Sequence, residues 1–195
     1  MPKTDSDVID TLAGIAPGSR LDTIRTLRPE ARKHAQLSYL GLFEPKDLGG
    51  VTATERFAVA AFVAGLHGRA ETSSFYAAGV PAELQATIAA EVATAKTSGP
   101  YGAYPKGPLS AEDKAGPLYH VADGARRVLG QRLASAFEHV HMLVFHPRDA
   151  APPSLQALLD AGWSATDVVT LSQLVAFLSF QIRVVAGLRT LASKL

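Results

Sequence analysis

Two helix-start signatures, each followed by an apolar run, constrain this chain more than any other feature of its sequence. Thr52 and Glu55 stand three residues apart in the first signature, and Ser164 and Asp167 in the second. In such a capping box the hydroxyl accepts a hydrogen bond from the N–H three residues later, while the acidic side chain bonds back. The following runs are apolar on nearly all sides, which is typical of buried helices.

The rest of the chain also favours helices. Apolar residues recur at helical spacing, Pro29 and Pro81 stand where helices begin, and no alternating run or Asn-Gly turn indicates a sheet. The sequence therefore predicts an all-α fold, with helical segments over 5–13, 21–27, 30–42, 56–66, a segment ending at 78, 81–95, 123–145, 152–160, and 167 to near the end.

The two halves of the chain look related. After each capping box, a second helical segment is expected to close near a glycine, Gly79 in one half and Gly187 in the other. This predicts one domain over 1–195 with two related helix-hairpin units about a pseudo-twofold axis. The boundaries are about 20–96 and 118–195, joined by a Gly- and Pro-rich linker over 97–117.

Composition narrows the functional classes. The chain has 195 residues, of which 47% are apolar, a formal net charge of +1 and no cysteine. It can bury a core, has no basic stripe for nucleic acid, and cannot form disulfides or use a thiolate. The uncharged run over 168–182 is shorter than the roughly 18 to 20 residues of a membrane span. We therefore expect no membrane or nucleic-acid partner, and a cytoplasmic location because the N-terminus lacks a signal-peptide core.

A cluster of polar residues in the 123–145 segment is the first candidate site. Glu138, His139 and His141 lie close together, and His146 follows. Glu138 could orient His141 at the i, i+3 spacing as a general acid–base pair, or these groups could be hydrogen-bonded structural residues. A metal fits less well, because His139 and His146 are about 10 Å apart along a helix. We expect neither a metal nor a cofactor.

Arg183 is the second candidate, on an otherwise apolar segment. It could grip a substrate carboxylate, or it could close a structural ion pair. His67 stands at a helix junction before Gly68 and is a further acid–base candidate.

The stretch from Gly68 to Tyr76 carries a family resemblance. The chain resembles the alkylhydroperoxidase-D/carboxymuconolactone-decarboxylase family over about 36–78, and more loosely over 127–188. Peroxidase members of that family carry a Gly-Cys-x-x-Cys-x-x-x-His stretch. Here Arg69 and Thr72 stand at the two cysteine positions and Tyr76 at the histidine, so thiol peroxidase chemistry is excluded.

The resemblance implies a homo-oligomer with pockets near subunit contacts. It also implies that Arg69, Thr72 and Tyr76 line a pocket suited to a small acidic ligand if that pocket is open. Two functions follow from it. One is a cofactor-free enzyme of the decarboxylase type acting on a small lactone or carboxylate. The other is a catalytically silent binding or assembly subunit that partners a cysteine-bearing paralogue.

Overall fold

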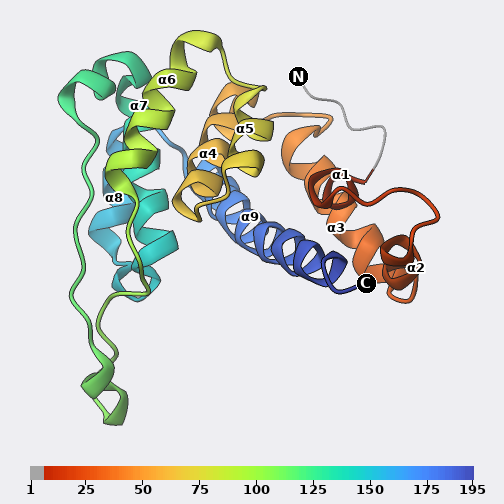
Figure 1. Cartoon of the computed structure of the whole chain (residues 1–195). Helices are drawn as coiled ribbons and strands as arrows, with labels where there is room; N and C mark the ends of the chain where they lie inside the picture. Colours follow the sequence, from red (N-terminus) through yellow and green to blue (C-terminus); the bar gives the residue numbers. More distant parts are fainter. Residues whose placement is uncertain (1–6) are drawn as a thin grey trace.

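A computed structural model of the chain describes residues 7–195, and within them nine α-helices and two short 3-10 helices form an all-α fold, as predicted (Figure 1). Residues 5 and 6, where the first predicted segment begins, lie outside the described residues. The helices are α1 (Val8–Ala13), α2 (Arg20–Thr26), α3 (Pro29–Phe43), α4 (Ala53–Leu66), α5 (Ala70–Ala77), α6 (Ala82–Ala95), η1 (Pro108–Glu112), α7 (Asp123–Phe145), η2 (Pro147–Asp149), α8 (Pro152–Asp160) and α9 (Ala165–Ala192).

Both predicted capping boxes are present and start the two central helices. In α4 the Thr52 hydroxyl accepts from the Glu55 N–H, and Glu55 accepts from the Thr52 N–H. Ser164 and Asp167 make the same reciprocal pair at the start of α9. Almost every residue of α4 is buried, and α9 crosses the middle of the molecule in contact with α1, α3, α4, α7 and α8 (Figure 1).

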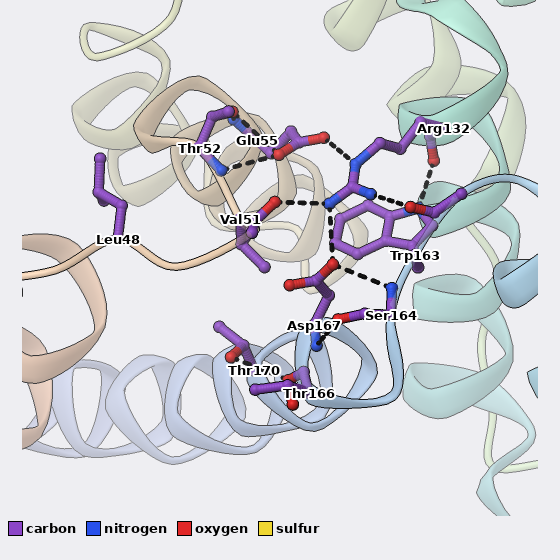
Figure 2. Close-up of polar contacts among 12 residues, drawn as sticks. Leu48, Val51, Thr52, Glu55, Arg132, Trp163, Ser164, Thr166, Asp167 and Thr170 are labelled. Carbon is purple, nitrogen blue, oxygen red and sulfur yellow. Dashed lines mark hydrogen bonds and ion pairs between the residues drawn. The ribbon is translucent and has the colours of Figure 1, made fainter.

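Arg132 of α7 joins the two capping boxes. Its Nε donates to the Glu55 carboxylate at 2.6 Å, and its Nη2 lies 3.4 Å from the Asp167 carboxylate (Figure 2). The acidic residue of each box therefore serves two partners, its own helix start and the shared guanidinium. Arg132 is thereby the point at which α4, α7 and α9 are held together.

The remaining donors of Arg132 fix two loops. The guanidinium donates to the Gly50 carbonyl at 2.7 Å and to the Gly162 carbonyl, and it lies over the Trp163 ring with 4.1 Å to the ring centroid. The Trp163 indole N–H returns a hydrogen bond to the Arg132 carbonyl at 2.8 Å (Figure 2). A planar guanidinium can serve this many acceptors and an aromatic face at once, which a lysine could not.

The second helix hairpin predicted from the sequence is wrong. α9 is a single helix of 28 residues that runs through Gly187 without a break, whereas α4 and α5 form a true hairpin. Gly79 also does not end α5 through a left-handed conformation, because its φ is not positive. A Cβ at Gly79 would stand 2.5 Å from the Phe57 ring, so close packing is what this position requires.

The chain between α6 and α7 is largely irregular and carries η1 away from the helices (Figure 1). The predicted long helix over 123–145 is present, but Gly130 breaks it with a φ of 78°, so its first turns are separate from the part that carries the histidines. Glycine adopts this conformation without the steric cost that other residues meet.

Among residues 7–195, α9 is the one helix that is long and apolar enough to cross a membrane, and 44% of its most apolar stretch is buried in the protein. The uncharged run over 168–182 is only part of this helix, which continues past Arg183 to Ala192 and so reaches a length that the run alone does not. Core helices of soluble proteins share this length and composition, so α9 alone does not indicate a span.

We predict that Arg132→Met lowers the free energy of unfolding by about 2–4 kcal/mol, because two carboxylates and two carbonyls lose their shared donor. Urea denaturation followed by far-UV circular dichroism measures this. Arg127→Met, at an exposed position on the same helix, is the matched control and should change stability by less than about 0.5 kcal/mol. Equal effects of the two substitutions would show that Arg132 is not a structural tie.

Two glycine substitutions should have opposite effects. Gly79→Ala is expected to destabilise by about 1–3 kcal/mol, because the new methyl group meets the Phe57 ring. Gly187→Ala should stabilise by up to about 1 kcal/mol, since it lies in open space inside a helix. Thermal denaturation of both variants checks the pair. A loss of stability in Gly187→Ala would mean that α9 is broken there after all.

Candidate functional site

A cavity of about 280 Å³ lies between α7, α8 and the segment over 117–120. Three of the site residues predicted from the sequence, Glu138, His139 and His141, line this cavity. Apolar side chains, including Leu118 and Met142, make up much of the remaining wall. A concave and largely apolar hollow with a few convergent polar groups is the usual form of a small-molecule site.

His141 is held as a neutral base. Its Nε2 lies 3.0 Å from the Ala95 carbonyl oxygen, which can only accept, so Nε2 carries the proton. Burial lowers the pKa of His141 and the neighbouring His146 lowers it further, against the opposing effect of the Ala95 hydrogen bond. The ring is therefore neutral at pH 7, and its Nδ1, which has no hydrogen-bond partner within residues 7–195, holds the free lone pair.

His139 lies two residues before His141 and lines the same cavity. It is also neutral at pH 7, because burial lowers its pKa. Its Nδ1 is inaccessible and has no hydrogen-bond partner in the described part of the chain. In the His139 ring, a guest molecule could therefore reach only Nε2. Buried polar groups without partners are rare in folded proteins, and they are commonly explained by a functional role or a bound molecule.

Aromatic and carboxylate groups support the two imidazoles. The Tyr119 hydroxyl donates to the buried Glu91 carboxylate at 2.6 Å, and its ring lies 5.0 Å from that of His141, centroid to centroid. Burial and the adjacent Glu91 raise the pKa of Tyr119 well above its ordinary value, so the hydroxyl stays protonated. His146 bridges the Asp149 carboxylate and the Pro117 carbonyl, at 3.2 and 3.0 Å.

The predicted Glu138–His141 pair is not formed. Glu138 instead accepts from the Val121 N–H at 2.9 Å and from the Arg126 guanidinium, and it lies 3.7 Å from a nitrogen of His120. These contacts fasten the segment before α7 over the cavity. At the i, i+3 spacing both side chains reach the same helix face, but the Val121 N–H before α7 and the Arg126 guanidinium of its first turns hold the carboxylate of Glu138.

Arg69 and Thr72 line a different hollow, between the start of α5 and the last turns of α9. His67 is half-buried at the end of α4, with its Nε2 3.5 Å from the Ser179 hydroxyl. Burial lowers the pKa of His67, and the nearby charges of Arg183 and Arg69 lower it further. The predicted acid–base candidates thus fall into two places, and His67 does not line the histidine cavity.

Tyr76 and Arg183 do not occupy the places predicted for pocket residues. Tyr76 is fully buried, with its ring 5.0 Å from that of Phe43 and its hydroxyl 2.6 Å from the Gln181 side-chain oxygen. Arg183 is exposed and donates to the Ser179 carbonyl of its own helix. The core therefore closes around the tyrosine, and the arginine faces solvent rather than an enclosed carboxylate.

The histidines do not converge on a single point. Among residues 7–195 no group of three or more His, Asp or Glu side chains is placed to hold a metal ion. The His141 and His146 rings are 5.9 Å apart at their centroids, and His146 already bonds through both nitrogens. The arrangement suits proton transfer better than metal ligation.

Arg132, Tyr119 and Glu91 were missed by reasoning from the sequence. Tyr119 lies in an irregular segment and Glu91 on another helix, so no spacing pattern joins them to the histidines. Arg132 had one usable signal, since two acidic caps and a single tryptophan beside the second cap call for a shared cation.

Comparisons with known proteins add no relative. No protein-family model, no curated protein and no solved structure matches the chain. The family resemblance of the sequence therefore stays a prediction, and function has to be inferred from the cavity itself.

We predict that the free energy of unfolding falls as the pH falls below about 6.5, where unfolded histidines take up protons. Folded His139 and His141 have lowered pKa values, so the unfolded chain binds protons that the folded chain does not. Urea titrations at pH 7.5 and 5.5 should show a smaller loss in the double variant His139→Gln/His141→Gln. His34→Gln, on the exposed face of α3, is the control, and the same reduction there would contradict the assignment.

Proposed function

We propose that this protein is a cofactor-free acid–base enzyme that acts on a small lactone or carboxylate in the histidine-lined cavity. The observation that carries the proposal is the state of His141, whose protonated Nε2 is fixed by the Ala95 carbonyl and whose Nδ1 is left as an unoccupied base. A general base is most effective when its neutral form is oriented and its pKa lies near the working pH.

The chemistry follows from the groups that line the cavity. Nδ1 of His141 would take a proton from the carbon next to a substrate carbonyl, and the electron pair of that C–H bond would move onto the carbonyl oxygen. Nε2 of His139 is the reachable donor for the oxygen that becomes negative. Returning the proton to another carbon completes an isomerisation. In a substrate whose carboxylate leaves as CO₂, no C–H bond is broken: the electron pair of the C–CO₂⁻ bond moves onto the carbonyl oxygen, and one proton from water, passed on by His141, then takes the place of the carboxylate on carbon.

The surroundings favour this reaction class over hydrolysis. Half-buried Met142 contributes apolar lining, which strengthens electrostatic interactions inside the cavity. Tyr119 and Glu138, which also line the cavity, are engaged by Glu91 and by Arg126. A cofactor-free decarboxylase of the alkylhydroperoxidase-D/carboxymuconolactone-decarboxylase family is the activity that the sequence resemblance suggests. Membership in that family is part of the proposal.

We also propose a cytoplasmic location, supported by the packing of α9 against five other helices. The alternative function is a catalytically silent subunit, either in a homo-oligomer or with a cysteine-bearing paralogue. One observation favours it, a groove of about 740 Å³ along α4, α5 and α6 lined largely by alanine, glycine and serine. Small residues permit close approach by a partner helix. Native mass spectrometry of the purified chain, alone and with such a paralogue, would detect that assembly.

We predict that the protein catalyses exchange of the α-hydrogen of small carboxylated lactones in D₂O, followed by ¹H nuclear magnetic resonance. His141→Gln should slow the exchange by about a hundredfold or more, because the base is lost. Met142→Trp should also abolish exchange by filling the cavity, with His141 retained.

His34→Gln should exchange at the wild-type rate, because His34 is exposed on α3 and remote in sequence from the cavity residues. Exchange that survives in His141→Gln with a folded protein would refute the proposed base. Absence of exchange with every carboxylated lactone tested would contradict the proposed activity and favour the silent-subunit alternative.

A further inference from the structure

A second hollow, of about 250 Å³, has two unlike walls and shares no lining residue with the histidine cavity. The first turn of α5 and the residues before it form the polar wall, over 68–72. The apolar wall comes from α9, through Ile182, Val185 and Ala186, with Arg189 at its end. A guest that suits both walls has one polar end and one apolar end.

The polar wall presents the open start of a helix. α5 begins at Ala70, and the side chain of the preceding residue, Arg69, makes no capping hydrogen bond. The first N–H groups of a helix have no partner within the helix, and they carry its positive dipole end. Such a start binds anions when something else holds them in place.

Thr72 supplies that second feature. It is only 4% exposed, it lines the hollow, and its hydroxyl makes no hydrogen bond to any group within residues 7–195. The Thr72 oxygen is not one of the enclosed polar atoms that lack a partner, so it is accessible from the hollow and is free to donate a hydrogen bond there. An acceptor atom of a guest in the hollow would accept that bond.

The charges around the hollow favour an anion. Arg69 is exposed, lines the hollow and makes no ion pair within the described residues. Glu71 is the one carboxylate in the wall, and it is already paired with Arg189. The remaining charge is therefore positive.

We propose that this hollow binds a carboxylate with a short apolar body. The carboxylate accepts from the first N–H groups of α5 and from the Thr72 hydroxyl, while Arg69 balances its charge. The apolar body lies against Ile182 and Val185. Inorganic phosphate shares the anionic chemistry but has nothing to place on the apolar wall, so it should bind more weakly. This site is independent of the activity proposed for the histidine cavity.

The test is a titration of the ¹⁵N-labelled full chain with sodium butyrate, and separately with inorganic phosphate, at constant ionic strength. Butyrate should shift the amide signals of 68–72 and 182–189. Thr72→Val should weaken butyrate binding about tenfold through loss of a hydrogen bond to a charged group. It should leave the melting temperature unchanged, because that hydroxyl bonds to no protein group.

Two charge variants should move affinity in opposite directions. Arg69→Ala should weaken butyrate binding about fivefold. Glu71→Gln should strengthen it about threefold, because it removes the one negative charge from the wall and releases Nη1 of Arg189, whose Nε and Nη2 stay bonded to the Leu12 carbonyl. Arg127→Ala, which removes an exposed charge from α7, should leave it unchanged.

Shifts elsewhere in the chain, or equal weakening by Arg127→Ala, would overturn the assignment of the site. Tighter binding of phosphate than of butyrate would overturn the assignment of the ligand class, because the apolar wall would then contribute nothing. Absence of any shift at the highest butyrate concentration of the titration would overturn the proposal as a whole.

Discussion

The guanidinium of Arg132 is the interaction on which the rest of this fold depends. The guanidinium only donates hydrogen bonds, and it donates to the two carboxylates that also cap the starts of α4 and α9. One side chain therefore sets the relative position of three helices. Each carboxylate has a helix N-terminus and a cation as partners, both of which stabilise its charge. The Trp163 ring beneath the guanidinium shields the cluster on one face.

The geometry of the histidine cavity depends on the contacts of Arg132 with Glu55 and Asp167. Arg132 and His139 lie on the same helix two turns apart, on the far side of the break at Gly130 from the start of α7. Fixing Arg132 therefore fixes the rotation of the segment that carries the histidines. Glu138 then holds the opposite wall by binding the segment before α7. The acidic residue that the sequence suggested for catalysis thus acts in positioning the cavity wall.

The sequence was sufficient wherever the determining contacts are local. Capping boxes and prolines act within one helical turn, so the starts of α3, α4 and α9 and the all-α class could be predicted from them. Predictions from the sequence failed where a residue distant in sequence determines the local structure. The sequence predicts that a helical segment closes near Gly187, but α9 continues through it. It places Tyr76 in a pocket if that pocket is open, but Gln181, remote in sequence, bonds the Tyr76 hydroxyl within the core. The link between His141 and Ala95 of α6 could not be inferred from spacing either.

The proposed activity depends most directly on the protonation state of one imidazole, that of His141. ¹⁵N nuclear magnetic resonance of the His141 ring, titrated from pH 8 to pH 5, reports which nitrogen carries the proton and the pKa of the ring. The structure predicts a neutral ring protonated on Nε2 at pH 7, with a pKa below the ordinary histidine value of about 6.5. Protonation on Nδ1, or a pKa at or above that ordinary value, would contradict the assignment of His141 as the oriented base.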